Sequence, residues 1–291
     1  MRRLLLLGLA LAAAGASAQP RLTTPEASPH ARTVQTVGIT ELAVDYHRPA
    51  VAGRVVWGDL VPYHAVWRAG ANDNTVFETS TAISVEGHPL PAGRYGVHAI
   101  PTETSWIVAF SHFADAWGSY SYDEAEDALR VTVEARPAPF GERLAWRFDN
   151  PTETAADLVL HWERLEVPVR ITVDTPALVL AGMERELRGV AGFYAEPWAQ
   201  IAEYALQHGL RTEEALAWAE RSLEMEATFG ARMTRAGLLD ALGRPDEAAA
   251  ARDQAFAEAS PDDVRAYARA QRRAGRTADA DAALARLEGQ P

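Results

Sequence analysis

Between residues 33 and 173 the chain consists of short runs in which apolar and polar residues alternate. In one such run Leu42, Val44 and Tyr46 fall on the same face, because successive side chains of a β-strand point to opposite sides. At least eight runs of this kind, bounded by Gly, Pro and Asn, recur about every 8 to 12 residues with no helical pattern between them. The pattern predicts an all-β sandwich, jelly-roll-like, over residues 32–174.

At the end of this region the alternation gives way to a helical period. Thr175 can cap a helix and Pro176 can occupy its first turn. Three glycines then follow helical runs at spacings of 34 and 32 residues, namely Gly209, Gly243 and Gly275. Glycine is favoured just after a helix because it adopts the left-handed conformation without strain. An all-α domain of helix pairs is therefore predicted over residues 175–291.

A repeat near 34 residues built from helix pairs is typical of tetratricopeptide proteins. The first pair resembles that family best, through Trp198, Ile201, Ala202, Gly209, Ala215 and Leu223. The other two pairs share mainly small residues at the helix crossings, which are Ala236, Ala248, Ala268 and Ala280. We therefore predict a tetratricopeptide-like array of about three units, with a helix over 176–189 as its cap or bridge, since short helix pairs bury their faces only against neighbours.

The first 18 residues have the three parts of a secretory signal peptide: a basic start, an apolar run, and a small-residue site ending at Ala18. We expect export to the periplasm or beyond, with an extended leader over residues 19–31. The chain has no cysteine, so neither a lipidated cysteine nor a disulfide is expected. No later stretch is long and apolar enough to predict a membrane span.

Charge narrows the classes of partner. The formal net charge is −12, and loss of Arg2 and Arg3 with the signal peptide makes it −14. Proteins bind nucleic acid mainly by neutralising phosphates with basic residues, so an acidic chain is a poor candidate for that class and for anionic membrane surfaces. A small-molecule or glycan ligand and a protein or peptide partner remain.

One irregular segment, residues 48–73, combines three arginines, two tryptophans and an Asn-Asp pair. Its prolines remove backbone donors and its glycines permit positive φ, which is typical of a binding loop or a structural corner. Several spaced motifs within and after it are recognisable: Arg48-Pro49, Gly53-Arg54, Trp57-Gly58-Asp59-Leu60-Val61-Pro62-Tyr63, Trp67-Arg68-Ala69-Gly70-Ala71-Asn72, Leu90-Pro91-Ala92-Gly93-Arg94-Tyr95 and Trp117-Gly118.

In the order of these motifs the chain resembles the domain-of-unknown-function family 2911, over roughly residues 28–174. Members are exported bacterial proteins in which helical repeats commonly follow the β domain, so the resemblance implies the same organisation here. It implies no activity, because none is established for the family. The family usually has an acidic residue and then a small one after Gly-Ala-Asn, where this chain has Asp73-Asn74.

The candidate ligand-binding residues are polar or aromatic side chains of this segment and one nearby loop: Arg48, Arg54, Trp67, Arg68, Asn72, Asp73 and Trp117. A guanidinium offers a planar fork of donors to carboxylates, phosphates or vicinal hydroxyls, and exposed aromatic rings can stack on sugar faces. The alternative is that the arginines pair with local carboxylates and with carbonyls of their own fold. For Trp106, Val108 and Phe110, which alternate on one face, the sandwich core is the favoured interpretation.

Catalytic and metal-binding patterns are weak. The chain has no Gly-x-Ser-x-Gly elbow, no cysteine and no lysine for a phosphate loop. Histidines lack the His-x-His or His-Glu-x-x-His spacing of metal ligands, so no metal or cofactor is predicted. A metal site would draw on His64, His98, His112 and His161. An acid-base pair of His64 with Asp73 is geometrically possible but has no spacing to support it.

In the helical domain, four arginines recur at spacings of four, three and four: Arg265, Arg269, Arg272 and Arg276. On a helix they share one face, which can receive an acidic peptide in the way that repeat proteins bind partner segments. The alternative is a solvated face that pairs with acids such as Asp262 and Glu258. We predict an exported, non-catalytic ligand-binding and protein-interaction scaffold. The alternatives are a hydrolase or metal-assisted enzyme with its site at residues 48–73, and a purely structural sandwich.

Overall fold

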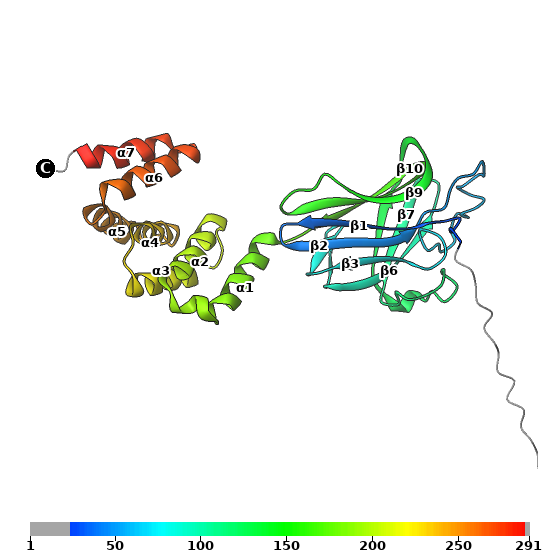
Figure 1. The fold of residues 1–291 in the computed structure, drawn as a ribbon, viewed down its shortest axis with the longest axis horizontal. Coiled ribbons are helices and arrows are strands. Elements are labelled where there is room, and N and C mark those ends of the chain that lie inside the picture. The colour runs from blue at the N-terminus through cyan, green and yellow to red at the C-terminus, as the bar shows by residue number, and fades with distance from the viewer. Residues whose placement is uncertain (1–23, 289–291) are drawn as a thin grey trace, which may run out of the picture.

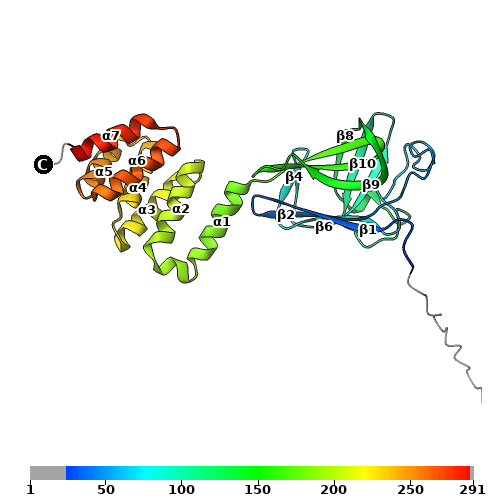
Figure 2. The same ribbon diagram turned by 45° about the horizontal axis from the view of Figure 1, so that its top comes forward.

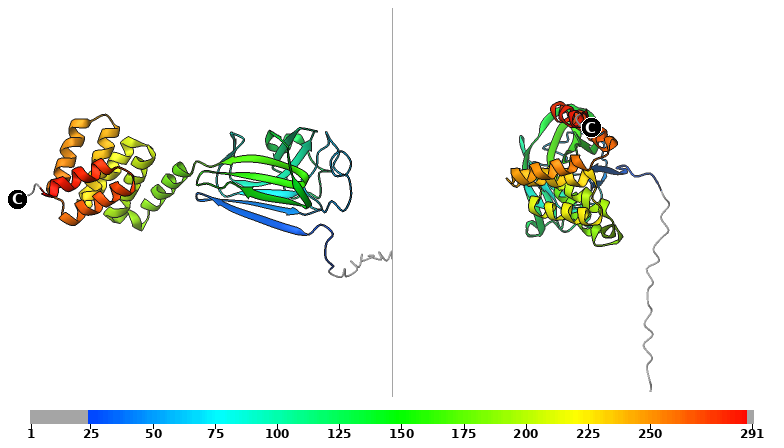
Figure 3. Two further views of the ribbon diagram at one scale, coloured as in Figure 1. Left: turned by 90° about the horizontal axis from the view of Figure 1, so that it is seen from above. Right: turned by 90° about the vertical axis from the view of Figure 1, so that its left-hand side faces the viewer.

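The computed structural model describes residues 24–288; the predicted signal peptide, residues 1–18, and the first part of the predicted leader lie outside the described residues. Figure 1 shows a β domain and a helical domain placed end to end in an elongated molecule. The view from above in Figure 3 shows the same separation, with helix α1 (Thr175–Leu187) between the two domains.

Two antiparallel sheets form the β domain, as the alternating pattern predicted. The larger has the strand order β1-β2-β3-β6-β7-β8 and the smaller the order β5-β4-β10-β9. The strands of the larger sheet are β1 (His30–Val37), β2 (Thr40–His47), β3 (Thr75–Thr79), β6 (Gly93–Pro101), β7 (Ser105–Ser111) and β8 (Asp127–Glu134). Those of the smaller sheet are β4 (Ile83–Val85), β5 (His88–Leu90), β9 (Arg136–Asp149) and β10 (Ala155–Thr172).

A single apolar core joins the two sheets. Leu42 and Val44 of β2 are fully buried in it, and so are Leu158 and Leu160 of β10. Each of these pairs is separated by one residue, so the period of two in the sequence places both members on the inner face of their strand. Burial of such alternating faces between two sheets is what holds a sandwich together.

Two irregular segments of the β domain matter for the site. The first, residues 48–73, connects β2 to β3, and the second, residues 112–123, follows β7 and leads to a short 3-10 helix, η1 (Glu124–Glu126), before β8. An antiparallel bridge between Asp73 and Trp117 joins them, and the backbone N–H of Asn74 donates to the carbonyl of Ala116 at 3.0 Å. The two segments therefore meet at one end of the larger sheet.

The helical domain follows β10 after a link of two residues and has seven α-helices within the described residues. After α1 and the 3-10 helix η2 (Val190–Phe193) come α2 (Ala195–His208), α3 (Thr212–Met225), α4 (Phe229–Ala241), α5 (Pro245–Ala257), α6 (Pro261–Arg273) and α7 (Thr277–Glu288). Neighbours pack as the pairs α2 with α3, α4 with α5 and α6 with α7, stacked side by side in Figure 2. The all-α region is thus confirmed, and its tetratricopeptide character stays a prediction.

The ends of these helices use the signals of the sequence, with one correction. Gly209, Gly243 and Gly275 all adopt positive φ after α2, α4 and α6. The cap of α1, however, is Asp174, whose carboxylate accepts from the amide of Ala177 at 3.2 Å. The hydroxyl of Thr175 instead donates to the carbonyl of Glu153 at 2.6 Å, because this residue is already helical and faces the β9–β10 turn. Among residues 24–288 no helix is long and apolar enough to cross a membrane.

Candidate functional site

Two of the three arginines in segment 48–73 bind their own fold. Arg48 donates through Nε to the carbonyl of Leu144 on β9 at 2.9 Å. Arg54 donates through Nε to the carbonyl of Val51 at 3.1 Å and through Nη2 to that of Ala50. A guanidinium satisfies several carbonyls that a loop leaves without ladder partners. These two side chains therefore support the corner.

Trp67 belongs to a cluster of indoles. Its ring lies 6.0 Å from that of Trp162 in a stacked arrangement and 6.0 Å from that of Trp57 edge to face, and Trp106 completes the group. The indole N–H of Trp67 donates to the carbonyl of Gly70 at 3.2 Å. Offset and edge-to-face contacts of this kind are the preferred packing of aromatic rings, so Trp67 joins the segment to the core.

Arg68 differs from the other two arginines. It is half-buried, no carboxylate among the described residues lies within ion-pair distance of it, and its Nε has no hydrogen-bond partner. Burial lowers the pKa of Arg68, against the opposing influence of Tyr120 and Asp73. Its guanidinium lies 6.0 Å from the centre of the Trp117 ring, a distance at which a cation is attracted to the ring face. Of the three arginines it is the one whose Nε has no acceptor among the described residues.

Trp117 and Tyr120 form an exposed aromatic pair on segment 112–123. Their ring centres are 5.7 Å apart, with only 10° between the planes, and the residues are 63% and 81% exposed. Apolar rings are normally buried, so two parallel rings held in water at the junction of two loops are an unusual surface. We call this pair the aromatic platform.

A pocket of about 370 Å³ opens beside the platform, with Trp117 in its wall. Two of its lining side chains are buried and keep polar atoms without a hydrogen-bond partner among the described residues. These atoms are both side-chain amide atoms of Asn74, which is 4% exposed, and Nδ1 of His47, whose Nε2 lies 3.4 Å from the carboxylate of Glu26. Unsatisfied buried polar atoms are rare in native proteins and point to a missing water or ligand. Asp73 and Asp115 supply carboxylates to the same pocket.

The remaining predicted residue, Asn72, is held in the left-handed conformation with φ of 57°. Its amide donates to the carboxylate of Glu26 at 3.3 Å and to the carbonyl of Ser28 at 3.5 Å. The structure therefore brings Arg68, Asp73 and Trp117 together and turns Arg48, Arg54 and Trp67 toward the fold. Asn74 and His47 were not predicted as site residues. In the sequence, only their positions next to Asp73 and Arg48 point to the site.

Behind the platform, His98 on β6 is a buried histidine, 2% exposed, and its Nδ1 lies 2.8 Å from the hydroxyl of Ser119. Burial lowers the pKa of His98 to about 4. The Tyr122 ring packs 4.7 Å from the imidazole, and its hydroxyl donates to Asp127. Burial raises the pKa of both Tyr122 and Asp127. Histidine 98 is therefore neutral near pH 7.

The histidines considered as metal ligands do not converge. Within the part of the chain that the structure describes, no group of three or more His, Cys, Asp or Glu side chains is arranged to hold a metal ion. His161 donates through Nε2 to the carbonyl of Pro139 at 2.8 Å, and His98 is engaged with Ser119. Both are thus bound within the fold.

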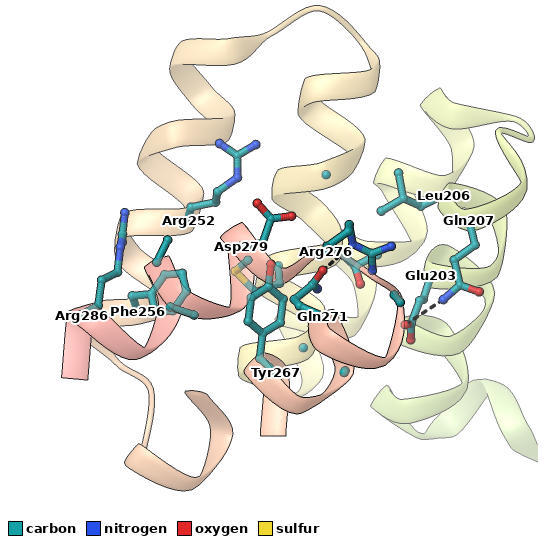
Figure 4. Close-up of a pocket in the computed structure, with 18 residues that line it drawn as sticks. Glu203, Leu206, Gln207, Arg252, Phe256, Tyr267, Gln271, Arg276, Asp279 and Arg286 are labelled. Carbon is teal, nitrogen blue, oxygen red and sulfur yellow. Dashed lines mark hydrogen bonds between the residues drawn. The ribbon is translucent and has the colours of Figure 1, made fainter. Parts of the chain in front are cut away.

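The helical domain has a groove of about 850 Å³ on its inner face (Figure 4). Residues from α2, α4, α5, α6 and α7 line it, including Glu203, Arg252, Phe256, Tyr267, Arg276 and Arg286. Of the four arginines predicted to bind a partner, only Arg276 lines this groove, because α6 ends at Arg273 and leaves Arg276 in the following turn. Its Nε donates to the side chain of Gln271.

The other three arginines of that set are exposed on α6 outside the groove. Arg265 pairs with Asp262 at 3.1 Å, and Arg272 pairs with Asp281 of α7 at 2.8 Å. Arg269 is exposed on the same helix. Exposed pairs of this kind contribute about 0 to 1 kcal/mol. The pairing with Asp262 matches the solvated-face interpretation, whereas Glu258 pairs instead with Arg232 of α4.

These features define an antiparallel two-sheet domain with a surface pocket, followed by a helical array. Residues 28–171 match the model of the family described as "Protein of unknown function (DUF2911)". The β domain of this chain belongs to that family. Comparisons with curated proteins and with solved structures each found no match.

Proposed function

We propose that the β domain binds a polyhydroxylated ligand, such as a segment of a glycan, on the aromatic platform and in the adjoining pocket, in a protein that is exported from the cell. The observation that carries the proposal is the parallel, exposed pair of Trp117 and Tyr120, of which Trp117 lines the pocket. The faces that these stacked rings leave exposed present an apolar surface that matches the C–H face of a sugar ring.

The polar groups of the pocket suit hydroxyls better than a charged ligand. Asp73 and Asp115 can accept hydrogen bonds, and the amide of Asn74 can both donate and accept. Arg94, which also lines the pocket, already pairs with Asp115 and with Glu78. A net negative chain with carboxylates at the pocket repels anionic ligands, so a neutral polyol is the favoured class.

The conformation of the platform also supports binding. Ligand sites usually pair apolar or aromatic surface with a few convergent polar groups, and here Arg68 supplies a half-buried cation at the Trp117 ring. A purely structural role would leave the exposed rings and the unpaired atoms of Asn74 and His47 without a reason. A bound ligand would cover the exposed rings and hydrogen-bond to the unpaired atoms of Asn74 and His47.

The test is binding of the mature chain to an immobilised panel of oligosaccharides, followed by titration of each hit with tryptophan fluorescence as the readout. We expect Trp117→Ala and Tyr120→Ala to weaken binding at least tenfold. Phe140→Ala is the matched control, because Phe140 is an exposed ring on β9 in the other sheet. Absence of any hit, or equal affinity of Trp117→Ala and the unchanged chain, would refute the proposal.

A second proposal is that the helical groove receives a protein segment. The groove combines two aromatic side chains, Phe256 and Tyr267, with Arg276 and Arg286 along one concave face, and such faces in helical arrays bind extended or helical peptides. Arg276→Glu is expected to weaken capture of a partner identified by crosslinking in the exporting cell. Arg265→Glu, on the outer face of α6, should leave capture unchanged, and equal effects of both would contradict the groove.

A further inference from the structure

One pair of side chains next to the platform has the geometry of an activated nucleophile. The hydroxyl of Ser119 lies 2.8 Å from Nδ1 of His98. Ser119 is partly exposed, whereas His98 is buried on β6. In the tautomer that carries its proton on Nε2, the imidazole accepts the Ser119 proton at Nδ1. A serine within hydrogen-bond reach of a neutral imidazole is the arrangement that general-base activation requires.

The surroundings hold this pair in one orientation. Tyr122 packs its ring against the imidazole at 4.7 Å and is tied by its hydroxyl to Asp127. Asp127 is in turn 3.7 Å from Arg130. The bond to Asp127 thus anchors Tyr122, whose ring packs against the imidazole of His98. An orienting shell of this kind separates catalytic pairs from mobile surface contacts.

A cation lies beside the serine. A side chain placed on Gly118, the residue before Ser119, would come 3.1 Å from Nη1 of Arg68, so the guanidinium lies against the backbone next to Ser119. Its Nε has no partner, and no carboxylate among the described residues pairs with it. Positive donors that are already in place near a reacting carbonyl stabilise the negative charge that develops on its oxygen.

We propose that Ser119 is a nucleophile activated by His98, and that the protein hydrolyses carboxylic esters whose organic group lies on Trp117 and Tyr120. The Ser119 oxygen bonds to the acyl carbon while its proton passes to Nδ1 of His98, and the alcohol leaves with that proton. Water then attacks the acyl-serine, gives a proton to His98, and Ser119 leaves with it. Arg68 faces the oxyanion in both steps.

This site differs from the enzyme alternative drawn from the sequence, which was placed at residues 48–73. Only Arg68 of that segment takes part, and the nucleophile and base come from segment 112–123 and β6. The proposal does not rest on glycan binding, because its test uses esters without a sugar. Failure of one proposal therefore leaves the other standing.

The first experiment is covalent labelling of the full mature chain with a fluorophosphonate, read by intact mass and by peptide mapping. We expect one adduct, on Ser119, and none on Ser119→Ala. Ser121→Ala is the matched control, because Ser121 is exposed on the same loop, and it should label as the unchanged chain does. No adduct on the unchanged chain, or an adduct that persists in Ser119→Ala, overturns the proposal.

The pH profile gives a readout that a structural serine would not produce. Labelling and hydrolysis of p-nitrophenyl acetate need His98 in its neutral form, and its pKa is lowered to about 4. The rate should stay level from pH 8 down to about pH 5 and fall to half near pH 4. A fall to half near pH 6.5, the ordinary value for histidine, would contradict the assignment of His98 as the base.

A second variant tests the pair without relying on a substrate. Since the chain has no cysteine, Ser119→Cys introduces a single thiol beside His98. We expect iodoacetamide to alkylate it at least tenfold faster at pH 6 than the thiol of Ser121→Cys, because the imidazole of His98, which is neutral at that pH, can take the thiol proton as the sulfur is alkylated. Adding His98→Gln should remove that difference. Equal rates for the two cysteine variants, with unchanged circular dichroism, would refute activation by His98.

Discussion

Two neighbouring irregular segments of the β domain have opposite roles. Segment 48–73 and segment 112–123 both carry aromatic side chains and glycines, and they meet at the bridge of Asp73 with Trp117. In the first, Arg48 and Arg54 donate to carbonyls of the fold, and Trp67 packs among other indoles. In the second, the rings are parallel and exposed.

Composition identifies a polar, aromatic loop but leaves open whether its side chains bind the fold or face a ligand. A guanidinium binds a carbonyl of its own chain with the same donors that it would offer a ligand. The number of arginines in a segment therefore does not show which of these acceptors they use. What distinguishes Arg68 is the absence, among the described residues, of an acceptor for its Nε. Side chains with hydrogen-bonding atoms that the fold leaves unpaired are therefore the better candidates for binding a ligand.

The largest difference is expected between the tryptophan cluster that anchors segment 48–73, which includes Trp106 of β7, and Trp117 of segment 112–123. Trp106, 1% exposed, packs against Trp57 and Trp67 of segment 48–73, and Trp106→Ala should lower the free energy of unfolding by about 3 to 5 kcal/mol. Trp117→Ala should change it by less than about 0.5 kcal/mol. Urea unfolding followed by circular dichroism measures both. Equal losses would mean that the platform is part of the core.

The next largest effect is the dependence of stability on pH through His98. Its pKa is about 4 in the folded chain and 6.5 ordinarily, so the unfolded chain takes up the proton first as the pH falls. The contribution of neutral His98 to the free energy of unfolding is complete above pH 6.5. It falls by about 3 kcal/mol as the pH is lowered from 6.5 to about 4. His98→Gln should flatten this slope in urea titrations at a series of pH values.

Asp127 acts in the opposite sense, because its raised pKa makes the folded chain take up a proton before the unfolded one. It is present in both proteins, so the difference between the unchanged chain and His98→Gln isolates the histidine. A slope that survives in His98→Gln would assign the pH dependence to other groups.

A smaller effect separates the arginines. Arg48→Ala should cost about 1 to 2 kcal/mol, because it leaves the buried carbonyl of Leu144 without the charged donor at 2.9 Å. Arg68→Ala should change stability by less than about 0.5 kcal/mol, since it removes a half-buried cation that has no carboxylate partner. Thermal unfolding of the two variants side by side makes the comparison. A greater loss for Arg68→Ala would show that it, too, supports the fold.

The smallest effect concerns two glycines with positive φ, Gly53 at 71° and Gly118 at 73°. Alanine at either should cost about 1 kcal/mol through the backbone. Only at Gly118 would the new methyl group also come 3.1 Å from Nη1 of Arg68 and from the ring of Tyr120. Near-ultraviolet circular dichroism should therefore change for Gly118→Ala and stay constant for Gly53→Ala. A change in both would uncouple the signal from the platform.

Much of the fold could be predicted because it depends on local periodicity. Alternation such as that of Leu42 and Val44 places the two residues on one face of a strand whatever the partner strand is, and glycines such as Gly209 end helices through their own backbone freedom. The helix cap at Asp174 was missed by one residue, because a carboxylate and a hydroxyl in consecutive positions are equally good caps.

The sequence by itself determined that the chain has a two-sheet domain followed by helices, that its β domain resembles one family, and that residues 48–73 are irregular. Only the tertiary structure decided which side chains of that segment hydrogen-bond within the fold, because the acceptor for Arg48, the carbonyl of Leu144, lies on β9, almost a hundred residues away. It also brought Ser119 to His98 and Trp117 to Asp73. These contacts arise from strand pairing across the sheet, a long-range choice that no local pattern encodes.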